Sequence, residues 1–125
     1  MNAAQRVVIR VDASTEMGMG HLMRCLSLAR ALADDGVKVS FLMRGHAAGL
    51  THLIEREGHA ARLLPDPGRR TDEAAADGTA HALWLPTTWR QDAEQTLEAI
   101  DLIGGANWLI VDHYALDARW ERMQR

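Results

Sequence analysis

The chain has 125 residues, of which 47% are hydrophobic, and its 14 basic and 17 acidic residues leave a net charge of −3. This length allows one buried core and is short for two domains. The balance of charge, with one Phe and one Tyr for base stacking, argues against a nucleic-acid-binding protein. The N-terminus lacks the apolar segment of a signal peptide, and no stretch approaches the roughly 18 apolar residues of a membrane span. We therefore expect a cytoplasmic protein that binds neither nucleic acid nor membranes.

The first part of the chain alternates between strand and helix patterns. Short β-branched runs predict strands over residues 7–12 and 37–43. Between them, apolar residues recur at helical spacing from Leu22 to Ala33, and Gly36 ends the predicted helix. This strand, helix and strand form the first unit of an α/β fold.

The same alternation continues to the C-terminus. Patterns predict a short helix over 50–58, a weaker strand over 61–64, an amphipathic helix over 93–103, a fully buried strand over 108–112 and a helix from Ala118. Strands that are apolar on both faces and alternate with helices indicate a parallel sheet covered on both sides. The expected fold class is therefore α/β, a Rossmann-like parallel sheet with helices on both faces.

Residues 65–88 interrupt this pattern. They are rich in Pro, Gly, Asp and Ala, and a loop of this length inside one domain is usually functional or disordered. We expect an excursion of the domain here rather than a linker. Trp84 and Trp89, which flank Pro86, are the better candidates for stacking on a sugar ring, whereas Trp108 and Trp120 are expected in the core or at a domain contact.

A glycine-bracketed turn precedes the first helix and places a histidine in the helix's first turn. Gly18 and Gly20 would leave backbone N–H groups exposed at the positive end of the helix, where phosphate or an anionic intermediate could bind. That end also disfavours an imidazolium, so His21 is expected in the neutral form that a general base requires. Such a base could take a proton from water or from a sugar hydroxyl. The alternative is that His21 only packs against the turn.

Further polar residues are predicted at the carboxyl ends of the first and last strands. Parallel sheets bind ligands at this edge, and the sequence places Asp12 after the first strand and Asp112, His113 and Tyr114 after the last. On the helix, Arg24 lies three residues after His21 and shares its face. We therefore expect these side chains to meet around one ligand.

Other kinds of site are less compatible with the pattern. The turn lacks the third glycine of the dinucleotide fingerprint and the Lys-Ser/Thr pair of a nucleotide triphosphate loop. His21, Asp112 and His113 could in principle hold a metal, but neighbouring strand residues point to opposite faces, so no metal is expected. Cys25, the single cysteine, excludes an internal disulfide and is expected to be a buried, inert thiol.

Three segments together resemble a known enzyme family. They are RVDASTEMGMGHLMRCLSLARAL, WRQDAEQTLEAI and WLIVDHYALDARWE. They are similar to the N-terminal half of the UDP-2,4-diacetamido-2,4,6-trideoxy-β-L-altropyranose hydrolases of pseudaminic acid biosynthesis, and the resemblance runs with interruptions from about Arg6 to the C-terminus. The combination of GxGHxxR with a distant VDHY is more specific than either motif alone.

The resemblance implies an N-terminal half of a two-domain fold of the glycosyltransferase-B type. Residues 1–125 would then be a single, truncated Rossmann-like domain, and the C-terminal nucleotide-binding domain would be absent. By motif, His21 falls on the catalytic histidine that activates water at the anomeric carbon of the UDP-sugar, and Tyr114 falls on the active-site tyrosine. The matches to substrate-binding positions are Asp12, Gly18, Gly20, Arg24, Asp112 and His113. The reaction releases UDP and needs no metal and no cofactor.

Two alternatives stay open. A glycosyltransferase of the same fold would use His21 to deprotonate an acceptor hydroxyl, and a non-catalytic module would only bind the sugar nucleotide. We expect the full-length protein to be a monomer. We expect this chain alone to show little activity, because a cleft with one wall neither excludes water nor binds the whole substrate.

Overall fold

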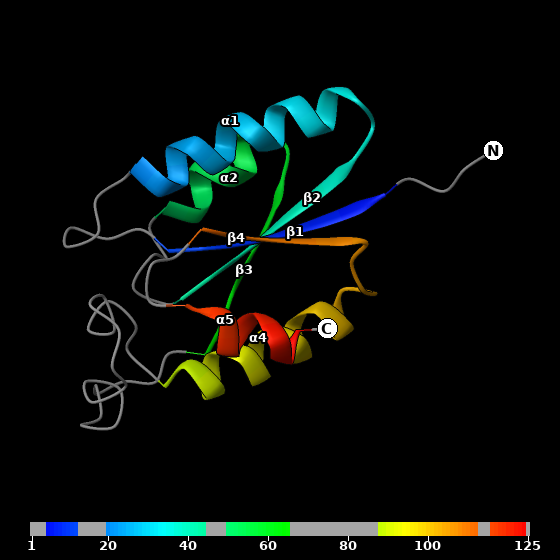
Figure 1. Ribbon diagram of the computed structural model, residues 1–125. Helices are drawn as coiled ribbons and strands as arrows, with labels where there is room; N and C mark the ends of the chain where they lie inside the picture. The colour runs from blue at the N-terminus through cyan, green and yellow to red at the C-terminus, as the bar shows by residue number, and fades with distance from the viewer. Residues whose placement is uncertain (1–4, 13–19, 45–49, 66–87, 113–115, 125) are drawn as a thin grey trace.

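The computed structural model describes residues 5–12, 20–44, 50–65, 88–112 and 116–124 as an α/β domain. Its strands are β1 (Arg6–Val11), β2 (Lys38–Met43), β3 (Ala60–Leu63) and β4 (Trp108–Asp112), and its helices are α1 (Gly20–Asp34), α2 (Thr51–Arg56), α4 (Trp89–Leu102) and α5 (Ala118–Met123). The strands form one sheet in the order β3-β2-β1-β4, and each neighbouring pair is parallel. Helices α1 and α2 cover one face, and α4 and α5 cover the other (Figure 1). The predicted Rossmann-like fold is confirmed.

The central strand β1 supplies apolar side chains to both faces, because successive residues of a strand point to opposite sides. Val7, Ile9 and Val11 join the core beneath α1 and α2, whereas Val8 joins the core beneath α4. All of them are at least 96% buried, as the continuous β-branched run predicted.

The helix boundaries follow local signals that were visible in the sequence. After α1, Gly36 adopts φ 82°, and the N–H of Val37 bonds to the carbonyl of Leu32 at 3.1 Å. This left-handed cap provides hydrogen bonds for carbonyl groups of the last helical turn and directs the chain into β2. At the start of α4, the hydroxyl of Thr88 accepts the N–H of Gln91 at 3.1 Å, and the Gln91 side chain accepts the N–H of Thr88.

Strand β4 is not the fully buried strand that its apolar sequence predicted. It lies at one end of the sheet and, in the described part of the chain, pairs with β1 alone. The side chain of Trp108 is 64% exposed, and the four residues that follow are only partly buried. The prediction of a fully buried strand over 108–112 is therefore wrong, because composition alone does not distinguish an edge strand from a central one. For Trp108 the structure excludes the core, and a domain contact, the other expected role, stays a prediction. Trp120, in contrast, is completely buried as predicted.

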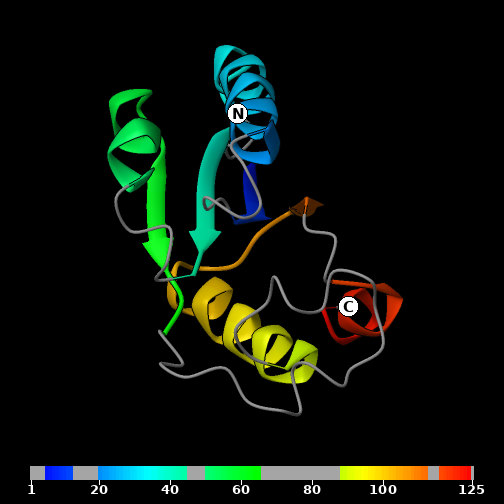
Figure 2. The ribbon, with the colours of Figure 1, turned by 90° about the vertical axis from the view of Figure 1, so that its left-hand side faces the viewer.

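The order of the strands determines where a ligand would lie. Helix α1, the next element after β1, covers one face of the sheet, and helix α5, the next element after β4, covers the other, so these two neighbouring strands are followed by helices on opposite faces (Figure 2). In open parallel sheets the crevice outside the carboxyl ends of such strands is the usual ligand site. None of the described helices is long and apolar enough to cross a membrane.

Candidate active site

The first turn of α1 and the end of β4 meet at this crevice. Val11 of β1 pairs with Asp112 of β4 in the sheet, so Asp112 lies beside the carboxyl end of β1. Helix α1 begins at Gly20 and places His21 over that point. The Nδ1 atom of His21 lies 2.7 Å from Oδ1 of Asp112, although the two residues are 91 positions apart in sequence.

Asp112 accepts hydrogen bonds from three side chains of α1. Besides His21, Arg24 donates from Nη2 to both carboxylate oxygens at 2.8 Å and from Nε at 3.1 Å, and Cys25 Sγ lies 3.6 Å from Oδ2. Burial alone would raise the pKa of Asp112, but the hydrogen bonds and charges of His21 and Arg24 lower it below its ordinary value. The carboxylate is therefore ionised at neutral pH.

An ionised Asp112 fixes the roles of the two imidazole nitrogens. The carboxylate has no proton to give, so Nδ1 of His21 must be the donor in the 2.7 Å bond. The guanidinium of Arg24, 3.4 Å from the same nitrogen, can only donate, so that contact is not a second hydrogen bond. In the neutral ring, Nε2 is then the proton acceptor, and Asp112 stabilises the imidazolium that forms when Nε2 takes a proton. We refer to His21 and Asp112 as the dyad.

Cys25 lies beside the dyad as the predicted inert thiol. Cys25 is 3% exposed. Burial, together with the nearby carboxylate of Asp112, raises the pKa of its thiol to about 12. A thiol with this pKa is protonated at neutral pH and is a poor nucleophile.

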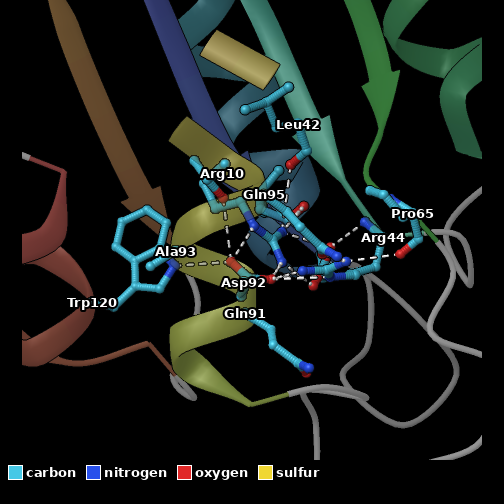
Figure 3. A network of polar contacts seen from close by, with 12 residues as sticks. Arg10, Leu42, Arg44, Pro65, Gln91, Asp92, Ala93, Gln95 and Trp120 are labelled. Carbon is cyan, nitrogen blue, oxygen red and sulfur yellow. Dashed lines mark hydrogen bonds and ion pairs between the residues drawn. The ribbon is translucent and has the colours of Figure 1, made fainter. Parts of the chain in front are cut away.

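A buried ionic network lies between the sheet and α4 (Figure 3). Asp92 of α4 accepts from Arg10 Nε at 3.1 Å, from Arg44 Nη2 at 2.7 Å and from the indole N–H of Trp120 at 2.9 Å. The side chains of both arginines and of Asp92 are fully buried. Burial would raise the pKa of Asp92, but the guanidiniums of Arg10 and Arg44 lower it. The network therefore ties α4 and α5 to the ends of β1 and β2.

Asp12 belongs to this network. Its two carboxylate oxygens accept from Arg10 at 2.8 and 3.1 Å, and Oδ1 also accepts the backbone N–H of Arg44 at 2.8 Å. The residue is 1% exposed and connects the carboxyl ends of β1 and β2. Its role as a substrate contact stays a prediction.

The other predicted site residues divide into two groups. The structure brings His21, Arg24 and Asp112 together, and it places Gly20 at the start of α1, where an added Cβ would meet no atom within 4 Å. Outside the described residues lie Gly18, Trp84, His113 and Tyr114.

Trp89, the other candidate for sugar stacking, meets two cations. The guanidiniums of Arg90 and Arg119 lie 5.3 and 4.9 Å from the centre of its ring. Trp89 also packs against the core formed by Ala93, Leu116 and Trp120.

Arg10, Arg44 and Asp92 were not among the functional residues expected from the sequence. One signal was present, since Arg10 interrupts an otherwise apolar strand and a charge there needs a buried partner. The partner itself, 82 positions away on α4, had no local signal. Among the described residues there is no cluster of three or more His, Cys, Asp or Glu side chains that could hold a metal ion.

Part of the chain is similar in sequence to a known protein. No protein-family model matches the chain. Over 92 residues, 74% of this chain, it is 30% identical to an uncharacterized glycosyltransferase of Methanosarcina acetivorans. The matched stretch is 21% of that protein, so the chain spans about a fifth of the relative's length.

Proposed function

We propose that this chain forms the sugar-binding side of an enzyme that moves the sugar of a UDP-sugar to an oxygen nucleophile, with His21 as general base. The observation that carries the proposal is the 2.7 Å bond between His21 Nδ1 and the ionised Asp112. A carboxylate that holds Nδ1 of an imidazole and leaves Nε2 to accept a proton is an arrangement that general-base catalysis commonly uses. His21 and Asp112 lie at the crevice between β1 and β4, and open parallel sheets usually bind ligands in such a crevice.

In the proposed step, Nε2 of His21 takes the proton of the attacking O–H group. The oxygen forms a bond to the anomeric carbon, the bond from that carbon to the UDP oxygen breaks, and UDP leaves with the electron pair. Asp112 acts as a positioning residue. The side chain of Arg24 is 63% exposed next to the dyad, and we assign it to the charge of the leaving diphosphate.

The sequence-predicted neighbours complete the proposed cleft. Gly18 and Gly20 would allow close approach of the substrate, Asp12 and His113 would line the cleft, and Tyr114 would act beside His21. These assignments follow the segment RVDASTEMGMGHLMR and the motif VDHY. No cofactor enters the step.

We assign water as the nucleophile, which makes the enzyme a hydrolase of a UDP-linked diacetamido-trideoxy sugar in pseudaminic acid biosynthesis. The resemblance of the two motifs supports this choice. The alternative is an acceptor hydroxyl, and the similarity to an uncharacterized glycosyltransferase favours it. Both reactions use the same base and the same leaving group.

We further propose that a second domain supplies most of the uridine site, as in the glycosyltransferase-B type of fold. The length of the relative supports this, because the part similar to our chain is about a fifth of it. The catalytic test therefore uses the polypeptide that carries both domains.

The test measures UDP release from the UDP-sugar by wild-type protein and by His21→Gln. We expect kcat to fall roughly 10²–10⁴-fold with KM little changed, since this is the usual contribution of a general base. The control is His52→Gln, which alters an exposed histidine on α2 and should retain activity. Turnover unchanged in His21→Gln would exclude this mechanism, whereas wild-type protein that binds the UDP-sugar without releasing UDP would support a binding module. Release that depends on an added sugar acceptor would indicate a transferase, and release without one would indicate a hydrolase.

A further inference from the structure

Two anions compete for the guanidinium of Arg24. In the structure it donates to Asp112, from Nη2 to both carboxylate oxygens at 2.8 Å and from Nε to Oδ2 at 3.1 Å. We have assigned the same side chain to the diphosphate of the leaving group. The edge formed by Nε and Nη2 holds one anion at a time in this bidentate manner, so binding of a diphosphate there displaces Asp112.

The ion pair between Arg24 and Asp112 is exposed on the arginine side. The side chain of Arg24 is 63% exposed, whereas that of Asp112 is 16% exposed. Water competes for the donors of an exposed guanidinium, and ion pairs of this kind contribute little to stability. The guanidinium can therefore leave Asp112 at low cost, while the carboxylate keeps its 2.7 Å bond to His21.

A diphosphate is the stronger competitor for this guanidinium. It carries more negative charge than a carboxylate, and its oxygens match the paired donors of an arginine. Helix α1 begins at Gly20, four residues before Arg24, and helical side chains lean toward the N-terminus of their helix. The side chain of Arg24 therefore extends toward the positive end of α1, which also attracts an anion.

The position of the guanidinium changes the charge that a protonated His21 meets. Nη2 of Arg24 lies 3.4 Å from Nδ1 of His21, and both side chains pair with Asp112. If Nε2 takes a proton in this state, two cations share one carboxylate and repel each other. When Arg24 pairs with a diphosphate instead, this repulsion decreases and the whole charge of Asp112 acts on the imidazolium.

We propose that Arg24 is a switch that strengthens the base when the leaving group is bound. Without substrate the guanidinium stays on Asp112 and weakens His21 as a proton acceptor. A bound diphosphate draws the guanidinium away and leaves Asp112 to His21, so that leaving-group binding and base strength are coupled. This inference rests on the proposed function and concerns the regulation of the same site.

NMR of the 125-residue chain, with inorganic pyrophosphate as the probe, tests the switch without turnover. We expect pyrophosphate to shift the Nε signal of Arg24 and the side-chain carboxyl ¹³C signal of Asp112. The matched internal control is Arg30 on the same helix, whose side chain is 68% exposed and pairs with Glu57 at 2.9 Å. The Arg30 signal should stay constant, whereas a general effect of ionic strength would weaken both ion pairs.

Two variants of the chain complete the test. In Arg24→Gln the carboxyl signal of Asp112 should differ from that of wild type before any addition, and it should not respond to pyrophosphate. In Arg30→Gln it should respond as in wild type. The proton on Nδ1 of His21 should remain in both variants, which shows that the dyad is still formed.

Three outcomes would contradict the switch. One is an Arg24 signal that pyrophosphate does not shift at any concentration. Another is a shifted Arg24 signal with an unchanged Asp112 signal, because the guanidinium would then bridge the two anions without leaving the carboxylate. The third is an equal response of Arg24 and Arg30. None of these signals depends on turnover, and the His21→Gln assay does not depend on them, so the switch and the proposed function can fail separately.

Discussion

At the scale of the residue, Asp112 determines how His21 can act. The amide in Asp112→Asn can accept the same hydrogen bond, but it removes the negative charge that stabilises the imidazolium. We expect kcat to fall about 10²-fold or more, within the range of general-base effects, while KM changes little. Steady-state UDP release by the two-domain polypeptide measures this, and the exposed Asp101→Asn on α4 serves as control.

A second measurement on Asp112→Asn does not require turnover. In the wild-type chain the ¹⁵N shifts of His21 should report a proton on Nδ1, because the carboxylate accepts there. In Asp112→Asn a mixture of tautomers is expected. A wild-type ring protonated on Nε2 alone would contradict the dyad, even if the enzyme were active.

Cys25 provides a prediction that depends on burial. Its pKa of about 12, compared with an ordinary value of 9.0, leaves about 10³-fold less thiolate at pH 8 than an unperturbed thiol has. We expect slow reaction with a disulfide reagent in the native protein and rapid reaction of the same sample in denaturing urea. Labelling at equal rates in the two conditions would show that the thiol is not shielded as described.

At the scale of the element, the Asp92 network joins α4 to two strands. Asp92→Asn leaves the buried guanidiniums of Arg10 and Arg44 without their full counter-charge, and breaking a buried pair typically costs about 3–5 kcal/mol. We therefore expect the free energy of unfolding to fall by about that amount at pH 7. Urea denaturation measures it, and the exposed Glu94→Gln on the same helix is the control. A change below about 0.5 kcal/mol, typical of surface sites, would contradict this role.

The same network predicts an acid dependence. Burial raises the pKa of Asp92, but the positive charges of the Arg10 and Arg44 guanidiniums lower it by more. The pKa is therefore lower in the folded protein than its ordinary value. Such a group stabilises the fold fully above its unfolded-state pKa of about 4, and this stabilisation is lost as the pH falls through the lower folded-state pKa. The difference in unfolding free energy between wild type and Asp92→Asn should be constant from about pH 6 to about pH 8. It should become smaller below about pH 4. A difference that grows in acid would refute the assignment.

Elements with local signals were predictable from the sequence, and contacts between distant elements were not. The periodic apolar residues of α1, the Gly36 cap and the β-branched run of β1 each specify their own structure. The pairing of His21 with Asp112 was predictable only coarsely, because topology brings the strand ends together but does not fix a 2.7 Å contact. The edge position of β4 depends on the strand order, and its sequence, which is apolar on both faces, predicted a buried strand instead.

At the scale of the whole molecule, the dyad lies on one wall of the proposed cleft. All its described contacts come from α1 and β4, so this domain can assemble the base without another domain. Binding of the uridine and exclusion of water are the tasks that we assign to the proposed second domain. The geometry of the base and the turnover of the enzyme should therefore be separable by experiment.

This separation predicts that the 125-residue chain has a formed dyad and little or no activity. With the UDP-sugar as substrate, UDP release by the chain should stay near the rate without protein, because binding energy from the remote nucleotide is needed to hold the anomeric carbon against His21. The NMR tautomer of His21 in the same sample should still show the proton on Nδ1, which excludes misfolding as the cause. The two-domain polypeptide at equal concentration is the positive control. Turnover by the short chain comparable to that control would mean that one wall suffices, and the second domain would then have no necessary part in the reaction.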